Sequence, residues 1–514
     1  YTVCLIIISN IMKKITLLKN FSTCFFLFFM ISNTCVFSQV GIGTTTPDAS
    51  SVLDVSSTTQ GLLAPRMTSS QKLAITSPAN GLMVYDTTLK AFNYYDSSST
   101  SWVNIGSSVK DGRLKFKLIK STDVLATVLA SEKSAGGSTK YLLDTNTLYE
   151  INGTIAVDLP IELNNAYVVG QDAGEDKLVK SSGDLFIGTT GGSVKILTLT
   201  ATSGNVFNVT GTGSIASGTQ TQSLVLRDCV IASSSNVGKI ENFALAFVSI
   251  VQFLGNTTGI VYKDISKVLI SNAAWFGNNS GTYETFLGTF GLMEKTGGFS
   301  EVYGTGIGID VSSNPTITGD AVLESAVFIG TLTTGKYVKG YTVGGYVGYN
   351  FDNKWTVRCA GIPTEGDAVA TGDMNFDYPV GSGASTTFNN SSPSSIIKLL
   401  GTSTSTNLYR FSRNSTDNRL QYLGTKKRFF QLTGSVSFQV SNAGTYIIYI
   451  AKNGVPITQY KVYGKGLASN DILVLPLIAS AELITNDYLE VYVQRYSGGN
   501  TDYIVTPNLN IVVR

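Results

Sequence analysis

The chain has no histidine, and it contains little charge, cysteine or proline. Its 514 residues include 37 Lys and Arg and 35 Asp and Glu, so only 14% are charged, against roughly a quarter in typical soluble domains. Without histidine, one chain cannot build a Ser-His-Asp or Cys-His nucleophile or a His-ligated catalytic zinc. The formal charge of +2 argues against a nucleic-acid partner, which requires a basic surface. The function classes that the composition leaves open are enzymes that use carboxylates and proteins that act through the shape of their surface.

Residues 1–38 have the pattern of a secretory signal peptide, because a basic start, an apolar run and small residues follow one another. These are Lys13, Lys14 and Lys19, then residues 24–31, then Val36-Phe37-Ser38. Cleavage there would leave Gln39 as the mature N-terminus. Residues 1–11 precede Met12 and are expected to lie upstream of the true start. A retained signal anchor is the alternative, but the apolar core falls short of the ~20 residues that span a membrane.

Strand signals dominate the rest of the chain. Short β-branched and aromatic runs alternate with clusters of Gly, Ser, Thr and Asn, and the one expected helix is short, near 69–75. The sequence therefore predicts an all-β protein, and a hydrophobic content of 43% is too high for disorder. The expected divisions are a module at 39–107, a linker at 108–140, a repetitive region at 141–330, a transition at 331–385 and a C-terminal unit at 386–514.

The first module carries the runs VGIGTTTPDASSVLDV, GLLAPRM and NGLMVYDTT between residues 40 and 88. This pattern resembles an N-terminal module of secreted surface proteins and tail-fibre-like proteins of Bacteroidetes, flavobacteria especially. The resemblance implies compartment and lineage rather than chemistry. Gly41-Ile42-Gly43 is not a nucleotide-binding loop, since no third glycine opens a helix after it.

Between 141 and 330, short apolar strands recur, and from Leu224 to Val268 they lie roughly 20–25 residues apart, as the coils of a solenoid do. Asn256, Asn272 and Asn278 suit turn positions where side-chain ladders form. The run YEINGTIAVDLPIELNNAYVVGQD at 149–172 resembles the opening coils of pectate-lyase-like β-helices and phage tailspikes. The resemblance predicts a right-handed parallel β-helix; a long β-sandwich is the competing interpretation.

Aromatic residues are dense after the repetitive region: Tyr337, Tyr341, Tyr346, Tyr349, Phe351 and Trp355. They either fill the core of a β-unit or, if exposed, stack on sugar rings. From residue 386 strict alternation returns, and Asn453-Gly454 is a strong hairpin turn. The runs FFQLTGSVSFQV and GTYIIYIAKNGVPI resemble TNF/C1q-like jelly-roll heads. The resemblance implies a jelly-roll head and assembly into trimers, but no ligand.

Without histidine, paired carboxylates on the β-helix are the one plausible enzymatic machinery. Carboxylates of glycosidases lie about 5–10 Å apart, and neighbouring strands about 4.8 Å apart, so residues one or two coils apart qualify. The carboxylates considered are Asp228, Asp264, Glu284, Glu294, Glu301 and Asp310. Asp264 and Glu284, 20 residues apart, form the first pair to test. Scattered carboxylates on an exposed face are the structural alternative.

Neither a cofactor nor a metal is expected. The sequence has no CxxC motif and no Asp-x-Asp-x-Asp-Gly calcium loop, and after position 38 only Cys229 and Cys359 remain. Two cysteines so far apart do not form a disulfide framework.

These features together predict a secreted, homotrimeric fibre- or spike-like protein, outside the cell, on its surface or on a virion. It would mediate multivalent adhesion or receptor binding, with cell-surface carbohydrate as the expected partner, and would have no membrane span in the mature chain. The alternative is a β-helix polysaccharide-degrading enzyme, a glycoside hydrolase or lyase like tailspike depolymerases. A purely structural surface-layer component is a third possibility.

Overall fold

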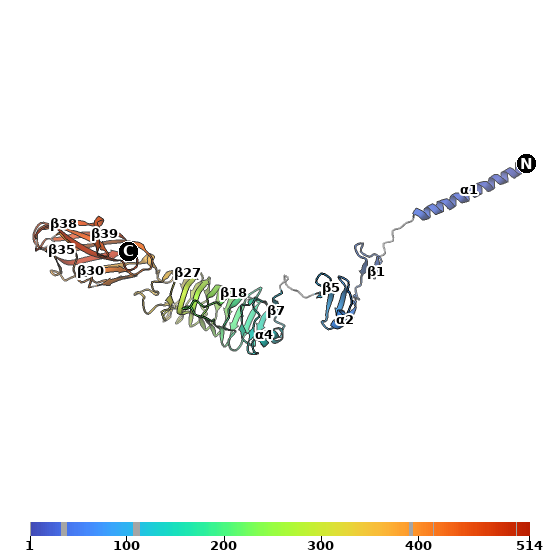
Figure 1. Cartoon of the computed structure of the whole chain (residues 1–514), viewed down its shortest axis with the longest axis horizontal. Coiled ribbons are helices and arrows are strands. Elements are labelled where there is room, and N and C mark those ends of the chain that lie inside the picture. Colours follow the sequence, from blue (N-terminus) through green and yellow to red (C-terminus); the bar gives the residue numbers. More distant parts are fainter. Residues whose placement is uncertain (1, 32–38, 106–113, 390–393, 415, 500) are drawn as a thin grey trace. The chain divides into compact units, whose positions relative to one another are not determined.

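The computed structural model describes residues 2–31, 39–105, 114–389, 394–414, 416–499 and 501–514, and it divides into two compact units, 1–110 and 111–514 (Figure 1). The first unit opens with helix α1 (Thr2–Ile31). Among the described helices, none is long and apolar enough to cross a membrane. The expected cleavage site at 36–38 and residues 108–113 of the expected linker lie outside the described residues.

The rest of the first unit consists of two small sheets. Strands β1 (Val40–Ile42) and β2 (Leu53–Val55) form a parallel pair. The second sheet has the order β3-β4-β5-β6, with strands Arg66–Met67, Met83–Asp86, Ala91–Asp96 and Ser101–Asn104. Helix α2 (Ser69–Leu73) starts at Thr68 with a capping box to Gln71. This confirms the short helix expected near 69–75.

This unit buries very little apolar surface. Val84 is the one fully buried apolar side chain among the residues described there, and the buried interior is otherwise polar, with Lys72 Nζ 2.8 Å from Asp86. The apolar side chains that remain exposed include Val40, Ile42, Val52, Leu53, Val55, Leu62, Leu63, Leu73, Met83 and Leu89. A unit of this size with so much exposed apolar surface needs a partner to cover it.

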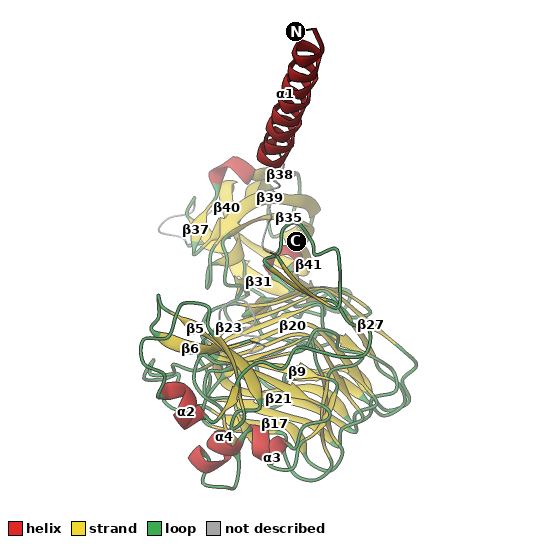
Figure 2. Cartoon of the chain, turned by 90° about the vertical axis from the view of Figure 1, so that its right-hand side faces the viewer, coloured by secondary structure: helices red, strands yellow, loops and turns green. Residues whose placement is uncertain are grey.

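The second unit begins with a parallel β-helix. Its 23 strands, β7 to β29, belong to one sheet in which each strand pairs in parallel with strands of the neighbouring coils (Figure 1). The strands are Phe116–Lys120, Tyr141–Leu142, Leu148–Asn152, Thr154–Ala156, Ile161–Glu162, Tyr167–Val169, Lys177–Lys180, Phe186–Gly188, Gly192–Lys195, Thr198–Ala201, Asn205–Thr210, Ser223–Ala232, Asn236–Glu241, Leu245–Leu254, Thr258–Ser271, Ala274–Trp275, Thr282–Thr296, Phe299–Glu301, Ile307–Asp310, Thr316–Ile317, Ala321–Ile329, Lys336–Lys339 and Trp355–Ala360. Strands and loops dominate the view of Figure 2. The predicted all-β fold with a parallel β-helix is therefore confirmed.

The interior of the β-helix is a continuous apolar column. Inward-facing side chains stack on their equivalents in the next coil, as Phe186 does on Phe207 (ring centroids 5.4 Å apart) and Phe253 on Trp275 (3.8 Å). A single coil cannot cover its own inner side, so stacking is what removes these rings from water.

Asparagine side chains also stack at one turn of the β-helix. Asn256 Nδ2 donates to Asn279 Oδ1 (3.0 Å), and Asn279 Nδ2 donates to the carbonyl of Phe253 (2.7 Å). Both side chains are buried. The expected ladder at Asn256 thus exists, but its partner is Asn279, while Asn278 accepts from the backbone N–H of Gly255 (3.0 Å).

Two short helices cover the first coil. Helices α3 (Leu125–Val128) and α4 (Ala130–Ala135) follow β7 directly. They add Leu125 and Leu129 to the apolar column, so the open end of the coil is shielded from water.

The C-terminal head is an antiparallel two-sheet sandwich with its own apolar core, as expected of a jelly roll. One sheet has the order β30-β41-β35-β39 with β31 beside β41; the other has the order β33-β34-β40-β36-β37, with β32 beside β40 and β38 beside β36. The strands β30 to β41 are Gly372–Asp377, Ala384–Thr387, Ile396–Lys398, Phe411–Asn414, Arg419–Tyr422, Arg428–Val440, Gly444–Lys452, Val455–Pro456, Val462–Gly466, Ile472–Leu483, Tyr488–Ser497 and Tyr503–Val513. Short 3-10 helices lie at η2 (Asp367–Val369) and η3 (Thr458–Tyr460).

The divisions of the chain differ from the expected ones. The β-helix runs from residue 116 to 360 rather than from 141 to 330, because part of the expected linker supplies β7, α3 and α4. The expected transition at 331–385 is shared out: β28 and β29 complete the β-helix, and β30 and β31 join the head. The head therefore starts near residue 372 rather than 386.

Candidate functional site

Asp264, the first of the two carboxylates proposed for catalysis, lies at a corner of the β-helix. Its backbone adopts φ +51° within β21, and its Oδ1 accepts a hydrogen bond from the N–H of Thr289 in the next coil (2.8 Å). A Cβ on the neighbouring Gly288, itself at φ +75°, would lie 2.1 Å from Oδ1. The Asp264 carboxylate thus links its corner to the equivalent corner of the next coil.

Glu284, the second, points into the β-helix and is fully buried. Lys295 Nζ lies 3.0 Å from its Oε2, and Trp275 Nε1 donates to its Oε1 (3.2 Å). Lys295 is buried as well. A carboxylate enclosed in this way has no access to a polysaccharide.

The structure therefore does not bring Asp264 and Glu284 together. In the observed register Glu284 pairs with Ile260, so Asp264 lies four positions further along β21, about 13 Å at 3.3 Å per residue. This exceeds the separation of glycosidase carboxylates. The proposed catalytic pair is wrong, since the two side chains occupy different positions and different sides of the strand wall.

The other carboxylates considered have structural partners or lie within strands. Asp228 lies 3.1 Å from Arg227, and Asp310 lies 3.1 Å from Lys339. Glu301 accepts from the N–H of Gly277 (2.8 Å). Glu294 lies in β23, in register with Leu269 and Val322.

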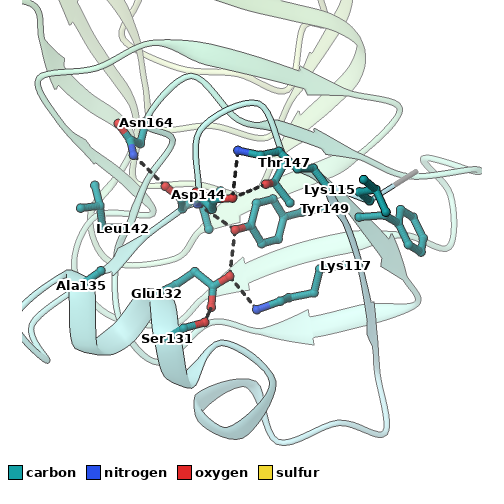
Figure 3. A pocket seen from close by; sticks show the side chains of 13 residues that line it. Lys115, Lys117, Ser131, Glu132, Ala135, Leu142, Asp144, Thr147, Tyr149 and Asn164 are labelled. Atoms are coloured by element: carbon teal, nitrogen blue, oxygen red, sulfur yellow. Dashed lines mark hydrogen bonds and ion pairs between the residues drawn. The ribbon is translucent and has the colours of Figure 1, made fainter. Parts of the chain in front are cut away.

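A cavity of about 450 Å³ opens at the first coil, beside α4 (Figure 3). Glu132 is its buried carboxylate, and it receives hydrogen bonds from Lys117 Nζ (2.6 Å), Ser131 Oγ (2.8 Å) and Tyr149 Oη (2.8 Å). Burial raises the pKa of Glu132, but these hydrogen bonds outweigh burial and hold the pKa below its usual value. Glu132 is therefore a charged, fully bonded anchor for α4 rather than a proton donor.

The aromatic residues noted between 337 and 355 divide into two groups. Phe351 and Trp355 are buried in the column of the β-helix, and Tyr337 and Tyr341 pack against it. Tyr346 and Tyr349, by contrast, line a large hollow where the last coil meets the head. The core interpretation thus holds for Phe351, Trp355, Tyr337 and Tyr341, while Tyr346 and Tyr349 line the hollow instead.

We call this space the junction hollow. It measures about 1080 Å³ and is lined by Gly345, Tyr346, Val347, Gly348, Tyr349, Pro363, Thr371, Ser405, Thr406, Asn407, Leu408, Tyr409, Phe411, Ser412, Arg413 and Leu423. One wall comes from the loop between β28 and β29 of the β-helix, and the other comes from the segment that enters β33 of the head. The hollow is therefore built from two parts of the chain that are far apart in sequence.

Three tyrosines form its aromatic wall. Tyr349 stacks on Tyr409 with ring centroids 3.9 Å apart, and Tyr346 meets the same ring edge-on at 5.1 Å. Burial raises the pKa of Tyr409 to about 12 and also raises the pKa of Tyr346. The hydroxyls of Tyr346 and Tyr409 are consequently neutral at physiological pH.

Hydrogen bonds hold both walls in place. The Tyr409 hydroxyl accepts from the N–H of Gly366 (2.7 Å), and the Tyr346 hydroxyl donates to Asn353 (3.0 Å). In the head, the buried carboxylate of Asp373 accepts from the N–H groups of Thr406 (3.1 Å) and Asn407 (2.6 Å). The polar loop 405–407 is thus fixed before any ligand arrives.

The junction hollow combines neutral rings with a few polar groups, which is the usual make-up of a ligand site. Tyr346 and Tyr349 belong to the aromatic segment noted in the sequence, whereas no sequence pattern indicated a role for Tyr409, Arg413 or the loop 405–407. Across the described residues, no group of three or more Cys, Asp or Glu side chains is placed to hold a metal ion.

Comparison with solved structures gives weak similarities. A tailspike protein 4 domain of bacteriophage CBA120 shares 9% identity over 88% of this chain and 77% of its own, with a TM-score of 0.20. A tailspike capsular polysaccharide depolymerase of Acinetobacter baumannii bacteriophage Fri1 shares 10% identity over 88% and 98%, with a TM-score of 0.20. Eiger TNF from S. frugiperda shares 7% over 28% and 91%, with a TM-score of 0.19. At such TM-scores these similarities carry no argument about function.

No curated protein sequence matches the chain. A family model does match: residues 41–121 correspond to a phage tail-like trimerisation region. This agrees with the sparse core and exposed apolar side chains of the first unit, which three chains together could cover. The chain therefore carries a phage tail-like trimerisation region, and this supports a homotrimer.

Proposed function

We propose that the protein is an extracellular, tail-fibre- or tailspike-like homotrimer that binds cell-surface carbohydrate through the junction hollow. The observation that carries the binding role is that Tyr346 and Tyr349, packed on the buried Tyr409, line the same hollow as the polar loop 405–407. A pyranose ring offers an apolar C–H face and a rim of hydroxyl groups, and this wall and loop match both. The trimer supplies three such sites, so weak single contacts combine into avid attachment.

Replacing Tyr349 tests the binding role. We expect Tyr349→Ala to weaken saccharide binding at a single site by about three- to tenfold, the contribution of one aromatic contact. Isothermal titration of the full chain against cell-surface oligosaccharides measures this affinity. Tyr303→Ala is the matched control, because Tyr303 is a half-exposed tyrosine on the β-helix outside the junction hollow. Equal binding by Tyr349→Ala and the unaltered chain would contradict the proposal.

Incubation of the protein with polysaccharide distinguishes a binder from a polysaccharide-degrading enzyme. We expect no new reducing ends and no unsaturated products after prolonged contact with the polysaccharide. Release of either product would replace the binding role with the enzymatic one.

Trimer formation is tested on the pair β1 and β2. Val40, Ile42, Leu53 and Val55 are exposed there, and in the parallel register Ile42 lies beside Val55. We expect Ile42→Asp with Val55→Asp to place repelling charges on this apolar surface and to raise the trimer dissociation constant at least about a hundredfold, as loss of two hot-spot contacts does. Light scattering across a dilution series measures the mass. Thr58→Asp with Thr59→Asp, both exposed, is the control. An unchanged dissociation constant for Ile42→Asp with Val55→Asp would show that this surface does not form the trimer contact.

A further inference from the structure

Charge inside the junction hollow is confined to one side chain. Of the described residues that line it, Arg413 alone is ionised, and the others are aromatic, aliphatic, hydroxyl or amide side chains and glycines. The hollow therefore presents one fixed positive charge with no lining carboxylate to compensate it.

Arg413 differs in this respect from three other arginines of the head, although Arg428 also donates to backbone carbonyls without an ion pair among the described residues. Arg410, Arg419 and Arg495 each lie within 3.5 Å of an aspartate oxygen. Within the described part of the chain, Arg413 has no such ion pair. Its Nη1 donates to the backbone carbonyl of Ser403, which anchors one edge of the guanidinium.

An anchored guanidinium has donors left over. Arginine carries five N–H groups in a fixed plane, and the Ser403 carbonyl engages one nitrogen. A planar carboxylate is the acceptor that fits the remaining edge, because two parallel N–H···O bonds form at once. Half-burial of Arg413 reduces the screening of such a pair by water and salt.

We infer that the junction hollow selects saccharides that carry a carboxylate, with Arg413 binding that group. A uronate unit has its carboxylate at the edge of the pyranose ring, so the ring can lie on Tyr349 while the carboxylate meets Arg413 and the hydroxyl rim meets loop 405–407. This inference rests on the proposed function and adds the chemical class of its ligand.

The test compares acidic oligosaccharides with their neutral equivalents on the full chain. Oligomers of polygalacturonate, alginate and hyaluronate are titrated next to their carboxyl-reduced counterparts, which differ only at that group. We expect at least one acidic oligomer to bind about ten- to a hundredfold more tightly than its reduced form, the range of a hydrogen-bonded charge pair. The preference should fall as salt rises.

Variants assign the preference to Arg413. Arg413→Gln should bind the acidic and the reduced form equally, and Arg413→Lys should retain part of the preference, because it keeps the charge and loses the planar fork. Arg227→Gln, at an exposed arginine on the β-helix, should retain all of it. Circular dichroism and unfolding of each variant show that the head is intact.

The outcomes separate this inference from the function on which it rests. If reduced and acidic oligomers bind equally to the unaltered chain, or if Arg413→Gln keeps the preference, the inference is overturned while saccharide binding stands. If no oligomer of either kind binds, the proposed function itself fails. Binding of sulfated or phosphorylated glycans instead of uronates would also overturn the choice of carboxylate.

Discussion

Lys295→Met should destabilise the β-helix by about 3–5 kcal/mol, because it leaves the buried carboxylate of Glu284 without its charged partner. Lys295 and Glu284 are both buried, with Nζ 3.0 Å from Oε2. Once Lys295 is lost, Glu284 keeps one hydrogen bond, from Trp275 Nε1. The midpoint of urea unfolding, followed by circular dichroism, measures the loss.

A second variant separates the charge from the packing. Glu284→Gln with Lys295→Met removes both charges and keeps an acceptor for Trp275, so most of the lost stability should return. Lys339→Met is the matched control, because its ion pair with Asp310 is half-exposed and should contribute less than about 1 kcal/mol. If the double variant is as unstable as Lys295→Met alone, the loss comes from packing and our interpretation of the pair is wrong.

Arg410→Met should have a similarly large effect on the attachment of the head to the β-helix. The buried Arg410 donates from Nη1 to Asp367 Oδ1 (2.6 Å) and from Nη2 to the carbonyl of Trp355, which opens β29 (2.5 Å). Its removal leaves a buried carboxylate and a buried carbonyl without this partner. We expect a loss of about 3–5 kcal/mol, seen in calorimetry as separate transitions of head and β-helix.

Two further substitutions test that assignment. Arg410→Lys keeps a charge for Asp367 but cannot also reach Trp355 in the same way, so its effect should be intermediate. Arg358→Met is the control, since the Arg358 side chain is 76% exposed where it pairs with Glu324. A single unshifted transition for Arg410→Met would show that the junction is held by other contacts. Weaker saccharide binding should accompany the loss, because Arg410 also contacts the Tyr409 hydroxyl (3.2 Å).

Structural features that depend on short stretches of sequence, such as strands, turns and buried strand faces, could be predicted. The repeated apolar strands indicated a β-helix, and Asn453-Gly454 indicated the turn that joins β36 to β37, where both residues have positive φ. The strict alternation from residue 386 onward indicated buried strand faces in the C-terminal unit, and Leu432, Val436 and Phe438 of β35 are indeed buried. In each case, local periodicity determines which side chains can leave water.

Register and docking could not be predicted in this way. The pairing of Asp264 with Glu284 assumed a coil of 20 residues, whereas Ile260 pairs with Glu284 and the register shifts between Lys263 and Ile265. A shift of one residue turns a side chain from one face of a strand to the other. The stack of Tyr349 on Tyr409 arises only when the head meets the last coil, and no local pattern encodes that contact.

The covers at both ends of the β-helix bear on how such a protein can change in evolution. Helices α3 and α4 close the first coil, and Arg410 of the head bonds to the last strand at Trp355. Each inner coil touches only its two neighbours. A duplication or deletion of about one coil, roughly 20–25 residues, would alter the length of the β-helix between its covered first coil and the junction hollow while leaving both intact. The length of the β-helix is thus a property that selection can adjust independently of ligand preference.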